Sequence, residues 1–455
     1  MASKPYYCDN HKVTLYNADC LDVLKELPSE SIDLLCTDPP YGIGFMGKDW
    51  DKALPLVDVW RECFRVLKAG VFAFVMCIPR QDCLARMIVS LQDAGFNTNF
   101  TSIYWAYASG FPKAQNTGKA IDKRLGAERE VVGENPYNKI RGKSSDNHTI
   151  VAPQDKCELT IPASPQAKAL DGSYGGFQPK PAVEVILVAM KPLSEKTYVD
   201  QALKNRKGIT WLDDGRIPFE ADDDKYKYKK CGGSSFGVGG GIDGTREYPA
   251  VSNPQGRFPA NLLVNDDVLN DGRIQKSGTA IRHNKGCVGS QNIAFTRSRP
   301  DWKEDYGFGD TGSFSRYFDL DKWFSERIKR LPESVQKTFP FLIVPKASKS
   351  EKNRGLDYEP KPIKGRDEGQ DVRNMPYKAR STPRINQHPT CKPLKLMCYL
   401  ITLGSREGDI VLDPFLGSGT TALACQLLGR GCIGIEISEE YCEIARSRCN
   451  QQVLI

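Results

Sequence analysis

The 455-residue sequence has no long hydrophobic run. Its longest uninterrupted apolar stretch, Val71 to Ile78, has eight residues. A membrane-spanning helix needs about 20. The first residues also lack the apolar core of a secretory signal. We therefore expect a cytoplasmic protein with no membrane association.

Histidine is scarce and paired cysteines are absent. The four histidines lie far apart in the sequence, and none of the 15 cysteines forms a C-x-x-C pair. Structural zinc requires clustered thiolates or imidazoles, so the sequence predicts no metal site. An odd number of scattered cysteines favours free thiols in a reducing compartment.

Strand-like and helix-like segments alternate in the first hundred residues and again near the C-terminal end. The first block predicts strands at 13–17, 32–37, 71–76 and 100–107, and helices at 20–27, 57–67 and 81–94. The last block predicts strands at 410–412 and 432–437, and helices at 394–403, 420–428 and 439–449. This alternation is typical of a parallel sheet covered by helices on both faces. The sequence therefore predicts one α/β sheet divided between the two ends of the chain.

The residues between these blocks follow no regular period. We expect an irregular insertion at 111–181, a core strand within 182–193, and a second irregular region at 194–385. The N-terminal half of the core is expected at 1–110 and the C-terminal half at 386–455, so the chain is divided into five segments. The glycine-rich stretch at 231–241 has no strand before it and no helix after it, which favours a flexible loop.

A glycine motif follows the predicted strand at 410–412. It reads Asp413-Pro-Phe-Leu-Gly-Ser-Gly-Thr and opens the next helix, and Glu436 ends the following strand. Glycines at such a junction let the backbone approach a ligand, and a carboxylate in that second position binds ribose hydroxyls. The third glycine of the dinucleotide pattern is missing. The motif alone leaves a nicotinamide site open, but it suits a nucleoside cofactor that has no pyrophosphate.

A second motif, Asp38-Pro39-Pro40-Tyr41, follows the predicted strand at 32–37. Two prolines stiffen the loop and remove two N–H donors, so it presents carbonyl oxygens. The exocyclic amine of a nucleobase is a poor nucleophile, since its lone pair is delocalised into the ring. A carboxylate and a carbonyl that accept its two N–H protons favour attack on an electrophile, and a tyrosine ring gives a flipped base a stacking face. An ordinary proline-rich turn is the alternative.

The two motifs, in this order, resemble the beta class of S-adenosylmethionine-dependent DNA amino-methyltransferases. In that class D-P-P-Y precedes a long variable region, and F-x-G-x-G follows it. His388-Pro-Thr-Cys-Lys-Pro is similar to the class's H-P-T-x-K-P element. The resemblance implies a circularly permuted, Rossmann-like α/β fold with a mostly parallel seven-stranded sheet and a target recognition region at 194–385. It also implies methyl transfer to an exocyclic amine, adenine N6 being favoured and cytosine N4 the alternative.

The resemblance assigns roles to particular residues of this chain. It makes Asp38, Pro39, Pro40 and Tyr41 the catalytic residues. S-adenosylmethionine is the implied cofactor, and the positions mapped to its binding are Asp19, Asp38, His388, Thr390, Lys392, Asp413, Phe415, Gly417, Gly419, Thr420, Glu436 and Tyr441.

Three other activities fit the sequence less well. A methyltransferase of RNA or of protein glutamine usually carries N-P-P-Y and places its cofactor motif first, and both features are reversed here. A DNA-binding module that has lost catalysis would not need to keep these motifs intact. Methylation at cytosine C5 requires a cysteine nucleophile, normally after proline, and the chain contains no Pro-Cys dipeptide.

The net charge of +7 is modest, but basic residues gather in one segment. The segment from Lys346 to Arg384 contains eleven Lys and Arg residues and six Asp and Glu residues. We predict that part of this segment contacts DNA phosphates, a solvated loop being the alternative. The predicted contacts are Arg366, Arg373, Lys378, Arg380 and Arg384. The resemblance further implies that double-stranded DNA is a partner. A cognate restriction endonuclease and a second copy of the chain are the other implied partners. The implied source is a prokaryote or a phage, and the implied location is the nucleoid.

Overall fold

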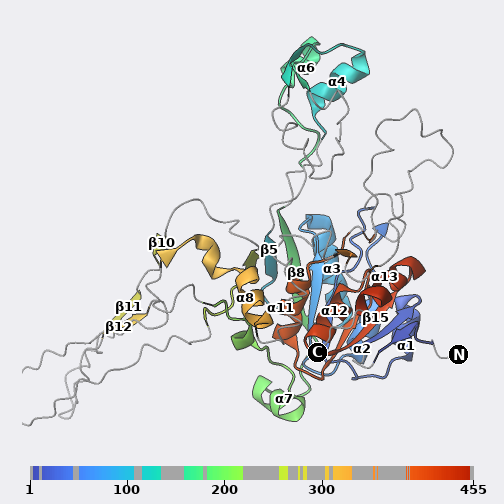
Figure 1. Ribbon diagram of the computed structural model, residues 1–455, viewed down its shortest axis with the longest axis vertical. Coiled ribbons are helices and arrows are strands. Elements are labelled where there is room, and N and C mark those ends of the chain that lie inside the picture. Colours follow the sequence, from blue (N-terminus) through green and yellow to red (C-terminus); the bar gives the residue numbers. More distant parts are fainter. Residues whose placement is uncertain are drawn as a thin grey trace, which may run out of the picture. The chain divides into compact units, whose positions relative to one another are not determined.

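The fold is given by a computed structural model (Figure 1). It describes residues 4–9, 13–44, 51–106, 115–134, 158–177, 182–218, 256–264, 275–276, 280–283, 303–306, 311–329, 352–353, 356, 386, 388 and 390–450. The chain divides into two compact units, each of which is described by itself. The first comprises Met1–Ala108, Val183–Arg354 and Thr390–Ile455, and the second Ser109–Ala182 and Gly355–Pro389.

One nine-stranded sheet forms the centre of the first unit, in the order β1-β2-β15-β14-β3-β4-β8-β5-β9. The strands are β1 (Tyr7–Cys8), β2 (Val13–Asn17), β3 (Leu34–Thr37), β4 (Phe72–Cys77), β5 (Ile103–Ala106), β8 (Val183–Met190), β9 (Leu262–Val264), β14 (Ile410–Asp413) and β15 (Gly431–Glu436). The predicted α/β class is confirmed. The strand count differs from the expected seven because two short edge strands, β1 and β9, extend the sheet.

Strands from the two ends of the chain lie side by side in this sheet. β14 pairs in parallel with β15 on one side and with β3 on the other, and β15 pairs in parallel with β2. The two C-terminal strands therefore lie between two N-terminal ones. β8 is antiparallel to both of its neighbours, β4 and β5, and is the exception to the predicted parallel arrangement within the interior of the sheet.

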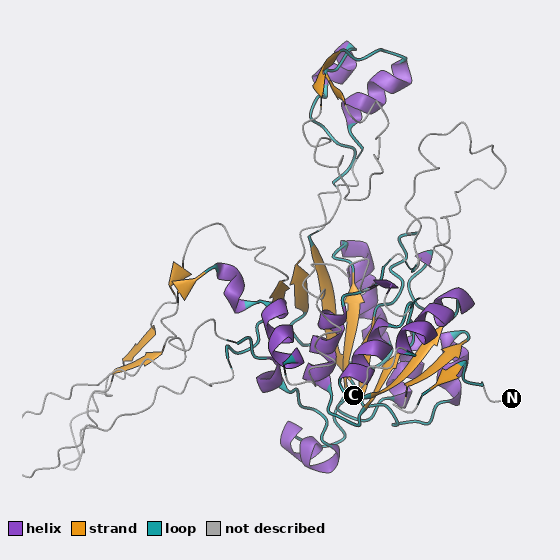
Figure 2. Cartoon of the chain, in the orientation of Figure 1, coloured by secondary structure: helices purple, strands orange, loops and turns teal. Residues whose placement is uncertain are grey.

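Helices cover both faces of the sheet (Figure 2). Successive residues of a strand point to opposite faces, and Leu34 and Leu35 of β3 accordingly belong to two different hydrophobic clusters. One cluster includes residues of α1 (Cys20–Glu26), α2 (Val57–Val66) and α3 (Gln81–Asp93). The other includes residues of α8 (Leu320–Ile328), α11 (Leu394–Gly404), α12 (Thr420–Leu427) and α13 (Glu439–Cys449). This double coverage explains why all six residues of β4 are buried.

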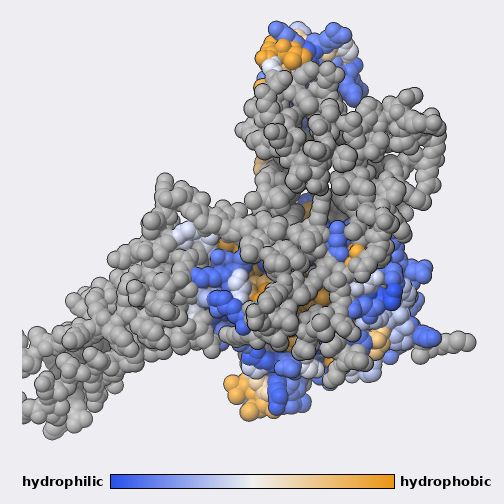
Figure 3. All heavy atoms as spheres, in the orientation of Figure 1, coloured by the Kyte–Doolittle hydropathy of each residue, from blue (hydrophilic) through white to orange (hydrophobic). Residues whose placement is uncertain are grey.

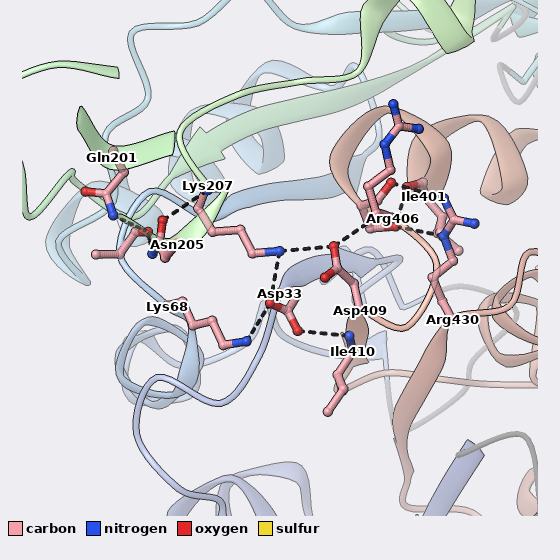
Figure 4. A network of polar contacts seen from close by, with 12 residues as sticks. Asp33, Lys68, Gln201, Asn205, Lys207, Ile401, Arg406, Asp409, Ile410 and Arg430 are labelled. Atoms are coloured by element: carbon pink, nitrogen blue, oxygen red, sulfur yellow. Dashed lines mark hydrogen bonds and ion pairs between the residues drawn. The ribbon is translucent and has the colours of Figure 1, made fainter. Parts of the chain in front are cut away.

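A network of charged groups lies where β3 and β14 begin (Figure 4). Lys207 Nζ contacts Asp33 Oδ1 at 2.9 Å and Asp409 Oδ2 at 3.0 Å, and Lys68 Nζ contacts Asp33 Oδ1 at 2.7 Å. Burial alone would raise the pKa of Asp33, but hydrogen bonds from Lys68, Ile410 N–H and Lys207 hold it below its usual range. The network ties the segment after β8 to the sheet at the edge opposite the carboxyl ends of the parallel strands.

The region expected to be irregular at 194–385 contains short elements among its described residues. They are α7 (Tyr198–Asn205), a 3-10 helix (Leu212–Gly215), β9, α8, a second 3-10 helix (Phe314–Tyr317) and the short strands β10 (Gln275–Lys276), β11 (Ala280–His283), β12 (Lys303–Tyr306) and β13 (Thr311–Gly312). Apolar side chains of α7 are exposed at the surface (Figure 3), where Leu203 is 82% and Val199 67% exposed. The glycine-rich stretch at 231–241 lies outside the described residues.

The second unit corrects the expectation of an irregular insertion at 111–181. It contains α4 (Thr117–Leu125), a pair of antiparallel strands, β6 (Val131–Glu134) and β7 (Glu158–Thr160), and α6 (Pro165–Ala169). The buried Asp122 carboxylate joins them by accepting hydrogen bonds from Ser164 Oγ at 2.6 Å and from Arg129 at 2.5 Å. Elements this short are stabilised by local polar contacts, so they produce no apolar period that a sequence could reveal.

Each helix among the described residues is too short or too polar for a bilayer span. Within the same residues, no three His, Cys, Asp or Glu side chains come together in a way that could hold a metal ion.

Candidate active site

The residues predicted to carry chemistry gather at the carboxyl edge of the parallel strands. Asp38 follows β3, Asp413 ends β14 and Glu436 ends β15. The antiparallel strand β8 begins at this same edge, because Val185 pairs with Cys77 at the end of β4. This places Glu184 beside the ends of the parallel strands. In α/β sheets of this kind ligands bind outside the carboxyl ends of the strands.

Both carboxylate oxygens of Asp38 already accept hydrogen bonds. Tyr41 Oη donates to Asp38 Oδ1 at 2.5 Å, and Lys392 Nζ donates to Asp38 Oδ2 at 2.5 Å. Lys392, only 8% exposed, also contacts Glu184 Oε2 at 3.3 Å. Lys392 was predicted to contact a cofactor, and the structure places its ammonium between two carboxylates.

Tyr41 is held at both ends. Its backbone N–H and that of Gly42 donate to Asp51 Oδ1 at 2.7 and 3.0 Å, while its hydroxyl binds Asp38. Burial, the charges of Asp38 and Glu184 and the hydrogen bond to Asp38 raise the pKa of the phenol well above its usual value. The hydroxyl is therefore a neutral donor at physiological pH. The ring stays close to Lys392 Nζ, which lies 5.7 Å from its centroid.

Asp413 lies beneath the glycine loop with its oxygens committed to protein donors. Thr37 Oγ1 donates to Oδ1 at 2.6 Å, Thr421 Oγ1 to Oδ2 at 2.5 Å, and Phe415 N–H to Oδ1 at 3.1 Å. Burial raises the pKa of Asp413 to about 6, although these hydrogen bonds oppose the shift. Asp413 thus joins the end of β3 to both ends of the glycine loop.

The Glu436 carboxylate closes the other side of the loop. Gly417 N–H donates to Oε2 at 2.9 Å, and Ser438 N–H donates to Oε1 at 2.8 Å. Burial raises the pKa of Glu436, with the backbone hydrogen bonds opposing the shift. Each carboxylate oxygen keeps a second lone pair for a hydroxyl donor.

The two glycines of the loop have left-handed backbones, with φ of +57° at Gly417 and +82° at Gly419. A Cβ atom at Gly419 would lie 2.8 Å from the Cβ of Ala445 on α13. Both the backbone angle and this close approach require glycine. Thr420 begins α12, and its hydroxyl lies 3.1 Å from Nη1 of Arg448, a fully buried residue of α13.

The remaining predicted residues lie as follows. Asp19 is exposed and caps α1, accepting from Leu21 N–H at 2.8 Å. Phe415 packs 6.1 Å from the ring of Trp60, and Tyr441 is buried in the first turn of α13. Thr390 is half-buried, and His388, whose N–H donates to Asn386 at 2.9 Å, belongs to the second unit. The five basic residues predicted to contact DNA, Arg366, Arg373, Lys378, Arg380 and Arg384, lie outside the described residues.

Two site residues were missed by sequence reasoning. Asp51 supports the loop of Tyr41 from 10 positions away, and Glu184 reaches Lys392 from the start of β8. A carboxylate at the start of an otherwise apolar strand was the available signal for Glu184, because the interior of a sheet rarely accepts an unpaired charge.

A known family matches most of the chain. The N6/N4 family described as DNA methylase aligns with residues 32–447. Among curated relatives, the type II methyltransferase M.HpaI of Haemophilus parainfluenzae is 51% identical over 65 residues, which is 14% of this chain and 21% of that protein. The orphan methyltransferase M.BamHII of Bacillus amyloliquefaciens is 51% identical over 69 residues, 15% of this chain and 26% of that protein. The chain spans between a fifth and a third of the length of the curated relatives it matches.

Solved structures give a more distant likeness. The PvuII DNA methyltransferase, described as cytosine-N4-specific, aligns with 99% of this chain and 90% of its own at 14% identity and a TM-score of 0.41. M1.HpyAVI aligns with 96% of this chain and 98% of its own at 13% identity and a TM-score of 0.35.

Proposed function

The chain belongs to the N6/N4 DNA methylase family, and from this premise we propose that it transfers a methyl group from S-adenosylmethionine to an exocyclic amine of DNA, at adenine N6. The observation that carries the proposal is the junction of two loops. The Asp38 loop follows β3 and the glycine loop follows β14, and the hydrogen bond from Thr37 to Asp413 joins them at 2.6 Å. An acceptor for an amine thereby lies beside a loop suited to a nucleoside cofactor.

The chain's residues fit the proposed cofactor. Gly417 and Gly419 keep the loop free of side chains, and Glu436 offers carboxylate lone pairs at the end of β15, where ribose hydroxyls bind in related folds. When bound, S-adenosylmethionine supplies a methyl group on a sulfonium centre. Gly417, Gly419 and Glu436 would hold the cofactor, and Asp413 maintains the glycine loop from beneath by accepting hydrogen bonds from Phe415 N–H and Thr421 Oγ1.

Asp38 is the proposed acceptor for the base amine. The hydrogen bonds from Tyr41 and Lys392 leave a further lone pair on each Asp38 oxygen, and one of these is proposed to accept an N–H of the base amine. The Pro39 carbonyl is the proposed acceptor of the second N–H. As positive charge develops on the nitrogen, these hydrogen bonds strengthen, so they stabilise the transition state more than the bound substrate. The ring of Tyr41 is proposed to stack on the flipped base.

Mass spectrometry of nucleosides from methylated DNA tests both the activity and the base. The chain is incubated with S-adenosylmethionine carrying a labelled methyl group and with DNA, RNA or protein in separate reactions. We expect labelled N6-methyladenine from DNA alone. Labelled N4-methylcytosine would support methyl transfer to DNA but show that the methylated base is cytosine and not adenine. Label confined to RNA or protein would contradict the proposed substrate.

Double-stranded DNA is the proposed partner, and the basic residues Arg380 and Arg384 are proposed to contact its phosphates. The double variant Arg380→Ala/Arg384→Ala should bind all DNA sequences more weakly. The slope of log affinity against log salt should fall by roughly one for each phosphate that the variant no longer neutralises. Binding is measured at several salt concentrations, with Arg61→Ala, an exposed pair partner of Asp58 on α2, as the control. An unaltered slope in the double variant would mean that DNA binds elsewhere.

A cognate restriction endonuclease and a second copy of the chain are further proposed partners, and the proposed location is the nucleoid of a prokaryote. These proposals follow from the resemblance of the chain to a family whose members include the DNA methyltransferases of restriction-modification systems.

A further inference from the structure

The Lys392 ammonium lies between two carboxylates in the proposed site. Its distances are 2.5 Å to Asp38 Oδ2 and 3.3 Å to Glu184 Oε2. All three side chains are largely buried: counting side-chain atoms alone, the exposed fraction is 9% for Lys392, 18% for Asp38 and 16% for Glu184. One cation and two anions leave the group with a net charge of minus one.

The charge balance determines how well Asp38 accepts a proton donor. A buried lysine that served Asp38 alone would neutralise the carboxylate and weaken it as an acceptor. The Glu184 carboxylate interacts with the same ammonium, so the ammonium neutralises less of the negative charge of Asp38. That charge is what stabilises the positive nitrogen formed when an amine attacks a methyl donor.

The fold gives Glu184 no other evident task. Among the described residues its Oε2 atom is buried without a hydrogen-bond partner, so the Lys392 ammonium is the group that offsets its burial. Leucine or valine would suit an interior strand better, because an unpaired buried charge is costly. Glu184 reaches the site because β8 runs antiparallel and begins where β4 ends.

We propose that Glu184 is a positioning residue that acts on Asp38 through Lys392. It shares the ammonium with Asp38 and thereby sets the strength of that carboxylate as acceptor for the base amine. This inference rests on the proposed function, and it adds a residue that neither sequence motif contains.

The variant Glu184→Gln tests the proposal because it removes the charge and keeps the shape. We expect kcat to fall about tenfold, while KM for S-adenosylmethionine stays unchanged, since a weaker acceptor affects the transition state. Glu184→Asp keeps the negative charge, but its side chain is one methylene shorter, so the carboxylate lies farther from Lys392. The kcat of Glu184→Asp should therefore lie between those of the wild type and Glu184→Gln. Glu195→Gln is the matched control, because Glu195 also pairs with a lysine, the exposed Lys204, beyond the other end of β8.

The pH profile separates this role from a merely structural one. Removing the Glu184 charge takes a like charge away from the neighbourhood of the Asp38 carboxylate, so the acid limb of kcat/KM should move to lower pH. A structural defect would lower activity without moving the limb. Within the described parts of the chain, the charged or titratable side chains near Asp38 are Tyr41, Lys392, Glu184, Cys77 and Asp413.

The acid limb decides the outcome. A downward shift in Glu184→Gln, with a smaller one in Glu184→Asp, supports the proposal. A limb that stays in place, or that moves up, overturns it. If Glu184→Gln does not fold, as judged by its thermal unfolding, Glu184→Asp alone must show the shift. Absence of DNA methylation by the wild-type chain would instead overturn the proposed function, so the two failures are distinguishable.

Discussion

Asp38→Asn is expected to reduce methyl transfer at least about 100-fold while the affinity for S-adenosylmethionine stays near that of the wild type. The amide keeps the size of the side chain but loses the negative charge that the developing cation on nitrogen requires. Its NH2 group can only donate, and it would face either the Tyr41 hydroxyl or the Lys392 ammonium, which are themselves donors to Asp38. The loss should therefore appear in kcat.

Methyl transfer to DNA and calorimetric binding of S-adenosylmethionine measure these two quantities separately. Asp58→Asn is the control, because Asp58 forms an exposed ion pair with Arg61 on α2. Activity of Asp38→Asn within tenfold of the wild type would remove Asp38 from the chemistry. If Asp38→Asn lost affinity for S-adenosylmethionine as strongly as it lost activity, Asp38 would act in cofactor binding and not on the base amine.

Lys392→Met should have a large effect on both stability and pH dependence. Removing the cation leaves Asp38 and Glu184 buried without their shared counter-charge, and breaking a buried ion pair in this way costs about 3–5 kcal/mol. Burial alone lowers the pKa of Lys392, but the charges of Asp38 and Glu184 raise it well above its usual value. A raised folded-state pKa means that the stabilisation is fully present below the unfolded pKa of about 10.4 and is lost as the pH rises through the folded pKa.

The same substitution should move the acid limb of activity upward. Without the ammonium, the Asp38 carboxylate loses its counter-charge and keeps the like charge of Glu184 nearby, which disfavours its charged form. The direction is opposite to that expected for Glu184→Gln. Urea unfolding at neutral pH measures the stability, and kcat/KM as a function of pH measures the limb.

Lys395→Met gives a matched control for a buried lysine. Lys395 is 1% exposed and pairs with Asp321 of α8. A comparable loss of stability is expected, with the acid limb unchanged in whatever activity remains. If both lysine variants moved the limb alike, the shift would reflect general destabilisation.

Most elements of the first unit could be predicted from the sequence. Helix α13 was predicted with the bounds that the structure shows, Glu439 to Cys449, and the other predicted helices end within a residue of the observed ones. The prediction succeeds there because strongly apolar strands and glycine helix ends leave local signals. The ordered parts of the second unit were not predicted, since they are short and depend on buried contacts of Asp122.

The candidate site was predictable as two motifs, whereas its charge pairing was not. Lys392 and Asp38 are 354 positions apart, and no local pattern indicates that their side chains meet. The contribution of Glu184 depends on the direction of β8, which sequence periodicity does not report. Asp413 and Glu436 were expected to face a cofactor, and the structure shows how fully their oxygens also serve the glycine loop itself.

The interleaving of β14 and β15 between β2 and β3 has a consequence during synthesis on the ribosome. Thr37 and its partner Asp413 are 376 positions apart, so at roughly 5–20 residues per second the centre of the sheet is completed about 20 to 75 s after β3 has been made. Until then β2 and β3 each present an unpaired edge, and an unpaired edge can join a neighbouring chain. We therefore expect the nascent protein to need protection from aggregation over this interval.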